Sequence, residues 1–441
     1  MGNTHWPCIT ALLCCPALYA AAATLEIGPG ADLSASIAAL QPGDELVLRG
    51  GSYPFDSRFR ITCVGTADRP IVIRGKAREA ALIQMDTPNQ NVIEIEGSQH
   101  LVVSNLHIRG GSIGVRLMSS SYVTIEDSEI YETGDVGLAA NAGGTYEGLI
   151  IRHNHIHHTS GTGEGIYLGC NGNECRVMHS IVEGNHIHDT NGPSVEQGDG
   201  IELKEGSAGN VIRNNVIHDT NYPGIITYST VGNGPANIIE GNAIWNSNDY
   251  AIQSAADSII RNNIVLGTIG LRAHQAGSPS NQLLVHNTII AEYDGIDVFN
   301  VSGSVVIANN AIYSRTGKAI RLISGKTNLV TVAGNVGGGS LSGGSGGFAK
   351  GAGISADLID ASFAGAPPID VFPKSGGALI AAGVAQYVTE YDFNGTPRGG
   401  IADVGAYRYQ AGGNLGWVLA TAFKAWPGVA AKNPSNVPTA H

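Results

Sequence analysis

The chain has 441 residues, of which 61 are glycine, 43% are hydrophobic and only 14% are charged. Acidic residues outnumber basic ones by 37 to 25, giving a formal net charge of −12. Nucleic acid is therefore excluded as the expected partner, because binding to a phosphate backbone depends on clustered Lys and Arg.

The N-terminal segment has the pattern of a leader. Residues 1–23 contain no Lys, Arg, Asp or Glu and carry the apolar run ITALLCCPALYAAAA. This pattern predicts a signal peptide that is cut after small residues, and hence a secreted or periplasmic protein. An uncleaved anchor is the alternative. No other stretch approaches the ~20 apolar residues that a membrane span needs.

Three of the six cysteines follow this leader. Cys170 and Cys175 bracket the sequence NGNE, and we expect them to form a small disulfide loop in an oxidising compartment. Cys63 is then left without a partner and is expected to be a buried thiol.

Residues 24–90 begin with a different pattern from the rest of the chain. The segment LSASIAALQPGDELVLRGGSYP predicts a short helix followed by strands. Such a unit would cover the N-terminal end of a repeat stack, where core residues and strand edges are otherwise exposed.

Residues 91–340 repeat one short pattern, an apolar strand that opens at Asn or Asp. The marking residues are 21 to 31 residues apart, and they are Asn105, Asp127, Asn154, Asn185, Asn215, Asn242, Asn263, Asn287, Asn310 and Asn335. A β-rich repeat of this length predicts a solenoid of about ten or more coils. Stacked Asn side chains at a turn hydrogen-bond along the axis and tolerate left-handed backbone, so we expect a structural role for them.

A second strand in each coil follows a Gly or Ala, and its residues alternate between two faces. The predicted inward column is Val115, Leu138, Ile166, Ile201, Ile225, Ile252, Leu271, Ile296 and Ile320. The first outward column is Arg116, Ala139, Tyr167, Glu202, Ile226, Gln253, Arg272, Asp297 and Arg321. The second is Met118, Asn141, Gly169, Lys204, Tyr228, Ala255, His274, Phe299 and Ile323. Because neighbouring strands lie ~4.8 Å apart, these two columns form one outward strip.

The repeat fades after about residue 340. Residues 341–409 contain DFNGTPRGGIADVGAYRY, which resembles the closing motif at the C-terminal end of many secreted right-handed parallel β-helix proteins. Arg398 and Asp403 would form a structural pair there. Residues 410–441 show no periodicity and are expected to be a loosely docked tail.

Ionisable residues concentrate in the longest coils. Around the single cation Lys204 lie six acidic residues, namely Glu164, Glu174, Glu196, Asp199, Glu202 and Glu205. Tyr167 and Tyr228 flank the lysine in the outward strip. A lone lysine on an outward strand is usually solvated, but this cluster also suits a reaction centre.

The run ELKEGSAGNVIRNNVIHDTNYPGIITYSTVGNGPANIIEGN, residues 202–242, resembles polysaccharide lyase family six, the alginate and dermatan lyases on a right-handed β-helix. That family has a similar Lys-Ser-x-x-Asn-x-x-Arg run. The resemblance implies an all-β, single-stranded right-handed parallel β-helix, a general base at Lys204 and calcium held by acidic residues. Asp199 takes the acidic position, with Glu196 nearby. The second catalytic group of the family, an Arg, falls at or beside Tyr228.

The chemistry of β-elimination from a uronate fits these residues. A cation must neutralise the sugar carboxylate before a base removes the C5 proton, and carboxylates suit Ca²⁺. We predict calcium at Asp199, Glu196 and Glu164, with Lys204 as the base and Tyr228 as the acid. Residues that would bind an acidic polysaccharide are Tyr167, Glu202, Arg272 and His274. We expect a monomer.

Three alternatives remain open. A glycoside hydrolase would use Asp199 and Glu202, since Asp294 and Asp297 lie four coils away. A non-catalytic carbohydrate- or metal-binding protein would use the outward pairs His155/His157 and His186/His188, extended by His218, where imidazoles suit copper or zinc; stacked surface histidines are the simpler interpretation. An adhesin needs only the shape.

Overall fold

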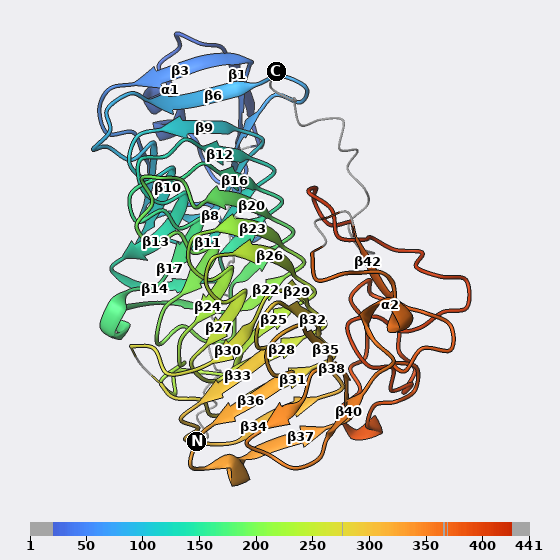
Figure 1. Ribbon diagram of the computed structural model, residues 1–441. Helices are drawn as coiled ribbons and strands as arrows, with labels where there is room; N and C mark the ends of the chain where they lie inside the picture. Colours follow the sequence, from blue (N-terminus) through green and yellow to red (C-terminus); the bar gives the residue numbers. More distant parts are fainter. Residues whose placement is uncertain (1–20, 276, 365–366, 368, 426–441) are drawn as a thin grey trace, which may run out of the picture.

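The computed structural model describes residues 21–275, 277–364, 367 and 369–425, and a single stack of coils runs through most of them (Figure 1). Each coil gives one strand to each of three parallel sheets, and every strand pairs with its counterpart one coil away. The predicted β-solenoid is confirmed, with 13, 12 and 13 strands in sheets 1, 2 and 3.

The strands of each sheet follow one another in chain order along the stack. Sheet 1 contains β1 (Thr24–Ile27), β2 (Glu45–Leu48), β5 (Ile71–Gly75), β8 (Gln99–Ser104), β11 (Ser121–Glu126), β15 (Ile150–Arg152), β19 (Ile181–Glu183), β22 (Val211–Arg213), β25 (Asn237–Glu240), β28 (Ser258–Arg261), β31 (Gln282–Val285), β34 (Val305–Ala308) and β37 (Val330–Ala333). Sheet 2 contains β4 (Arg60–Ile61), β7 (Ile93–Glu96), β10 (Val115–Met118), β13 (Leu138–Ala142), β17 (Ile166–Leu168), β21 (Ile201–Leu203), β24 (Ile225–Thr227), β27 (Ile252–Ser254), β30 (Ile269–Leu271), β33 (Ile296–Phe299), β36 (Ile320–Ile323) and β39 (Leu341–Ser342). Sheet 3 contains β3 (Gly51–Phe55), β6 (Ala81–Met85), β9 (His107–Gly110), β12 (Glu129–Tyr131), β16 (His155–His157), β20 (His186–Thr190), β23 (Val216–Thr220), β26 (Ala243–Ser247), β29 (Ile264–Leu266), β32 (Thr288–Ala291), β35 (Ala311–Ser314), β38 (Asn335–Gly338) and β40 (Phe348–Lys350).

The described structure also contains two small strand pairs, two short α-helices and three 3-10 turns, which are η1 (Asn171–Asn173), η2 (Thr327–Leu329) and η3 (Ala385–Tyr387). β14 (Gly144–Glu147) pairs in parallel with β18 (Cys175–Met178), and β41 (Leu358–Asp360) pairs antiparallel with β42 (Asp370–Pro373). The helices are α1 (Leu33–Ala38), at the N-terminal end of the stack in Figure 1, and α2 (Ile354–Asp357). α1 buries Leu33 and Ile37 in the core of the coils. Among the described residues no helix is long and apolar enough to cross a membrane.

The inward column of sheet 2 forms the core as predicted, with one correction of register. Ile252 pairs with Ile269, and Ile269 pairs with Ile296, so Ile269 holds the position expected for Leu271. Leu271 is still buried because it lies two residues further along the same face. As a result Gly270, not Arg272, stands in the first outward column, and Arg272 directly follows Leu271 at the position expected for His274.

A glycine directly precedes several strands of sheet 2, including β17, β21 and β24, and allows neighbouring coils to approach closely. A Cβ atom on Gly165 would lie 2.7 Å from the carbonyl oxygen of Gly200, and one on Gly200 would lie 2.4 Å from that of Gly224. A side chain at these positions would therefore push the coils apart, just before the strands that carry the candidate site.

The asparagine ladder is a continuous chain of buried hydrogen bonds. From Asn154 to Asn335, the Nδ2 of each residue donates to the Oδ1 of the next at 2.9–3.1 Å. The expectation of left-handed backbone at these residues is wrong, because a positive φ is found at the preceding residue instead, as at His153 and Asn214. Asn105 and Asp127 have positive φ themselves, so they occupy that preceding position rather than the ladder.

The C-terminal segment folds back along the stack instead of forming only its end. In Figure 1 the residues after β40 lie beside sheet 3. Apolar residues of this segment, including Phe393, Tyr407 and Leu419, pack on the outward side of Trp245 and Tyr313. The expected loose docking of residues 410–441 is therefore wrong for 410–425, where Leu419 and Lys424 are buried; residues 426–441 lie outside the described part.

Arg398 binds backbone rather than the Asp403 carboxylate. It donates to the carbonyl oxygens of Asp403, Gly405 and Tyr407, while the Asp403 carboxylate accepts from the amides of Ala381 and Tyr409. The expected pair thus exists only as a contact between the arginine and the main chain.

The cysteine predictions are confirmed. Cys170 and Cys175 form a disulfide, and Cys63 is a buried free thiol. Of the predicted leader 1–23, residues 1–20 lie outside the described structure.

Candidate active site

The candidate site lies on the outward side of sheet 2, where β17, β21 and β24 are neighbours. Tyr167 on β17 pairs with Glu202 on β21, and the backbone amides of Lys204 and Tyr228 continue the ladder just after β21 and β24. Strand alternation explains the arrangement: Ile201 and Leu203 point into the core, so Glu202 and Lys204 point out of it. The structure brings these predicted residues together.

Glu164, Asp199 and Glu202 form an acidic cluster. One oxygen of each lies within 4.8 Å of the others, and all three residues are at most 2% exposed. Glu164 Oε1, Asp199 Oδ1 and Glu202 Oε2 accept no hydrogen bond from any described residue. Burying carboxylate oxygens without hydrogen-bond partners costs free energy. The cluster is therefore suited to a cation, which would be the missing partner of these oxygens.

Burial and mutual repulsion change the acidity of this cluster. Burial raises the pKa of Glu164 to about 7, against a hydrogen bond from the Thr162 hydroxyl that lowers it. Burial, followed by the charges of Glu202 and Glu164, raises the pKa of Asp199 well above its usual value. Without a cation, protons must therefore neutralise part of the cluster near neutral pH.

Lys204 is the one cation beside the cluster among the described residues. Its Nζ lies 2.6 Å from Glu202 Oε1 and 3.3 Å from the Tyr228 hydroxyl, which itself donates to Glu202 Oε1 at 2.9 Å. The Nζ also lies over two aromatic rings, 5.1 Å from the centroid of Tyr167 and 4.8 Å from that of Tyr228. Burial and the Glu202 charge raise the pKa of Tyr228, so its phenol stays protonated.

His274 reaches the site from a loop rather than from the strip. It lies beyond β30, and its ring is tilted against that of Tyr228 with centroids 5.3 Å apart. Arg272 lies further along the stack, over the rings of Tyr250 and Phe299. Both residues are exposed.

Two predicted assignments change with the geometry. Glu196 is exposed and lies outside the acidic cluster, in a turn whose backbone bonds to Gly161 of the preceding coil. Glu202, predicted to bind substrate, completes the cluster instead. The sequence analysis did not predict a role for Thr162, whose hydroxyl donates a hydrogen bond to Glu164 Oε2 at 2.6 Å. Its position two residues before Glu164 could have indicated this contact.

A surface hollow lies elsewhere on the molecule. It is lined by Arg109, Glu132, His158 and Asp189, among others, and none of the acidic-cluster residues borders it. The candidate site is therefore defined by its buried carboxylates and lysine, and this hollow is not part of it.

Comparisons with known proteins identify the family of the fold that carries this site. The model of the right handed beta helix region family matches residues 76–197 and 182–336, more than half of the chain. The chain belongs to this family. The solenoid is therefore right-handed. No curated protein matches the chain by sequence.

Solved structures share this fold at low identity. Pectate lyase Pel9A is 14% identical, with 89% of this chain and 97% of that chain covered and a TM-score of 0.52. The A-module of mannuronan C-5 epimerase AlgE6 from Azotobacter vinelandii is 12% identical, with 73% and 92% covered and a TM-score of 0.54. An alginate lyase from Paenibacillus sp. str. FPU-7 is 20% identical, with 75% and 99% covered and a TM-score of 0.45. At these identities the likeness concerns the fold.

Proposed function

We propose that the protein is a secreted polysaccharide lyase that cleaves a uronate-containing polysaccharide by β-elimination. The observation that carries this proposal is the juxtaposition of three buried carboxylates, each with an unpartnered oxygen, and one buried lysine. Elimination at C5 of a uronate needs a positive charge for the sugar carboxylate and a base for the neighbouring proton. Proteins named for pectate and mannuronan share the fold, in agreement with this substrate class.

Calcium is the cofactor that fits the acidic cluster. Glu164, Asp199 and Glu202 offer only oxygen ligands, which Ca²⁺ prefers, and three carboxylates beside one lysine leave excess negative charge. Bound there, calcium would neutralise the carboxylate of the substrate and make the C5 proton more acidic.

Lys204 acts as the base in this proposal. Its Nζ forms an ion pair with Glu202 Oε1 at 2.6 Å. A cation held by Glu202 would compete with Lys204 for this carboxylate and would add a positive charge beside the Nζ, and both effects would favour the neutral amine that a base requires. Lys204 Nζ then takes the C5 proton.

Tyr228 completes the elimination. As the C5 proton leaves, a double bond forms between C4 and C5, the C4–O bond breaks, and the Tyr228 hydroxyl protonates the leaving oxygen. Lys204 Nζ lies 3.3 Å from that hydroxyl, so the captured proton can return to Tyr228 and restore both groups. The neighbouring sugars would bind to Tyr167, His274 and Arg272.

The hydrolase alternative fits the geometry less well. An inverting glycosidase separates its two carboxyl groups by about 6.5–9.5 Å to admit a water molecule, whereas Asp199 and Glu202 offer oxygens within 4.8 Å of each other. The pair Asp294 and Asp297 is engaged by Arg321 at 3.1 and 3.3 Å. Neither pair presents the free acid and base that hydrolysis requires.

The test is an assay on alginate, polygalacturonate and glycosaminoglycans, with calcium or with a chelator. β-Elimination creates an unsaturated uronate that absorbs in the ultraviolet, whereas hydrolysis creates reducing ends without that absorbance. We expect a calcium-dependent rise in absorbance on at least one polymer. Reducing ends without absorbance would establish a hydrolase, and neither signal on any polymer would refute catalysis on this class.

A further inference from the structure

The outward side of sheet 3 carries a group of histidines that the proposed elimination does not use, and five of them lie on the neighbouring strands β16, β20 and β23. His155 and His157 on β16 pair in register with His186 and His188 on β20, and His218 on β23 follows His188. Their rings stack from coil to coil, with His157 over His188 at 5.1 Å and His188 over His218 at 4.9 Å between centroids. This histidine row therefore lies where two of the longest coils meet.

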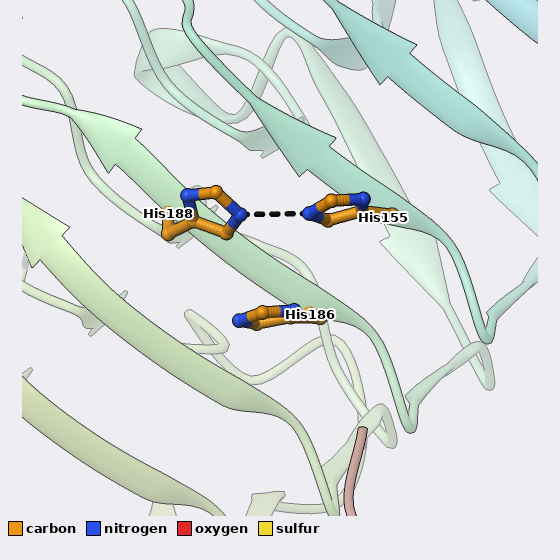
Figure 2. Close-up of side chains that lie close together, drawn as sticks. All are labelled: His155, His186 and His188. Carbon is orange, nitrogen blue, oxygen red and sulfur yellow. Dashed lines mark hydrogen bonds between the residues drawn. The ribbon is translucent and has the colours of Figure 1, made fainter. Parts of the chain in front are cut away.

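Three members of the row converge. Figure 2 shows the rings of His155 and His188 directed toward each other from two neighbouring strands. The ring of His186 stacks on that of His155, with centroids 5.1 Å apart. One ring nitrogen of each lies within 4.8 Å of the others, and His155 Nε2 lies only 2.7 Å from His188 Nε2. His186 is 8% exposed. Three imidazoles are thus gathered in a half-buried position.

A carboxylate fixes the proton on the far side of the His188 ring. Asp189 Oδ2 lies 2.7 Å from His188 Nδ1, so that nitrogen carries the proton and the Nε2 of a neutral ring presents a lone pair to His155. The Nδ1 of His155 in turn faces Glu129 Oε1 at 3.6 Å. Metal-bound histidines usually have such a carboxylate partner on the other nitrogen.

We propose that His155, His186 and His188 bind one divalent transition-metal ion of the zinc and copper class. Imidazole nitrogens suit these ions, whereas Ca²⁺ prefers oxygen, so the ligand chemistry separates this site from the acidic cluster. Tetrahedral zinc with bonds of about 2.0–2.1 Å places its nitrogen ligands about 3.4 Å apart. The Nε2 atoms of His155 and His188 are 2.7 Å apart, so they need to move apart by less than about 1 Å to reach this spacing.

The C-terminal segment covers the site. Phe423 lies edge-on to His155 and His186, with centroids 6.2 and 5.7 Å away. Lys424, the next residue, anchors the segment by donating to Asn214 Oδ1 at 2.8 Å and to the carbonyls of Gly241 and Phe393 at 2.7 Å. An ion bound beneath Phe423 would join β16 to β20, and we expect it to stabilise the stack at that point.

The experiment is a calorimetric titration of zinc chloride into tag-free, full-length protein that has been treated with a chelator and dialysed. We expect one equivalent to bind in the unmodified protein and in His100→Ala, a control in which the lost ring stacks only on Tyr122. His155→Ala and His188→Ala should each weaken the binding by about tenfold or more. Excess calcium should not displace the zinc.

The test includes a second variant and a second readout, so that misfolding of one variant does not decide the outcome. His188→Gln keeps a polar side chain of similar size, so it is measured in parallel in case the alanine variant fails to fold by circular dichroism. Electron paramagnetic resonance of bound copper(II) should show imidazole nitrogen couplings that diminish in His155→Ala. The proposal is overturned if the unmodified protein binds no zinc, or if folded His188 variants bind it as tightly as the unmodified protein does.

Discussion

Glu164 should make the stability of the metal-free protein depend on pH. Burial raises its pKa from 4.5 to about 7, so the folded protein retains a proton that the unfolded chain releases. The stabilising contribution is complete below about pH 4.5 and is lost as the pH rises through about 7. The shift corresponds to roughly 3 kcal/mol, most of which disappears between about pH 5 and about pH 8.

Urea unfolding in the presence of a chelator measures this effect. Glu164→Gln stays neutral at every pH, so the free energy of unfolding of the variant minus that of the unmodified protein should increase by about 2 to 3 kcal/mol over this interval. Exposed Glu174 provides the control Glu174→Gln, which should follow the unmodified protein. If Glu164→Gln loses stability with pH as steeply as the unmodified protein does, the assigned role of Glu164 is wrong.

Three further predictions concern the cofactor, the acid and the ladder. Calcium at about a hundredfold excess over its Kd should raise the free energy of unfolding by about 2.7 kcal/mol at alkaline pH; Asp199→Asn should lose most of this gain in thermal melts, and an equal gain in both proteins would exclude the acidic cluster as the site. Tyr228→Phe should lower kcat by about 10²–10⁴ with little change in KM, and an unchanged kcat would remove the tyrosine from the reaction. Asn215→Ala removes four buried side-chain hydrogen bonds and should cost about 3 kcal/mol or more in chemical denaturation, whereas the exposed Asn248→Ala should cost almost nothing; equal effects would contradict the structural role of the ladder.

The sequence predicts the solenoid and most of its core, because one aliphatic column recurs through the coils. It could not fix the register of the coil around Leu271. Period-two alternation is unchanged when a strand slips by two residues. Gly270 directly precedes Leu271, whereas Thr268, and neither a Gly nor an Ala, precedes Ile269. Only the pairing of Ile269 with Ile252 and Ile296 decides between the two registers.

The C-terminal segment shows a different limit. It has no repeat that would indicate its path, but its partner surface carries a signal. From β26 onward, sheet 3 is apolar on both faces, as in AIWNS and TIIA. Strands of this kind are covered on both sides, so a covering segment could have been predicted there. Which residues supply it could not, since that depends on contacts between distant parts of the chain.

The candidate site was predictable in composition but not in its division of roles. Strand alternation placed Tyr167, Glu202 and Lys204 on one strip, and the structure brings them together. Whether Glu202 points to substrate or to Glu164 and Asp199 depends on loop geometry before each strand, which periodicity does not describe. The same limit explains why Glu196, equally acidic and close in sequence, lies outside the cluster.

The central claim is that Lys204 removes a proton from a uronate. The most direct test compares initial rates of unsaturated-product formation, with saturating calcium and a polymer that responds, for the unmodified protein, Lys204→Ala and Lys326→Ala. Lys326, in a surface turn before the last coil, gives a matched loss of one lysine away from the site. We predict that Lys204→Ala folds but forms no measurable product while Lys326→Ala is unaffected. Product formation by Lys204→Ala at the rate of the unmodified protein would contradict this role of the lysine.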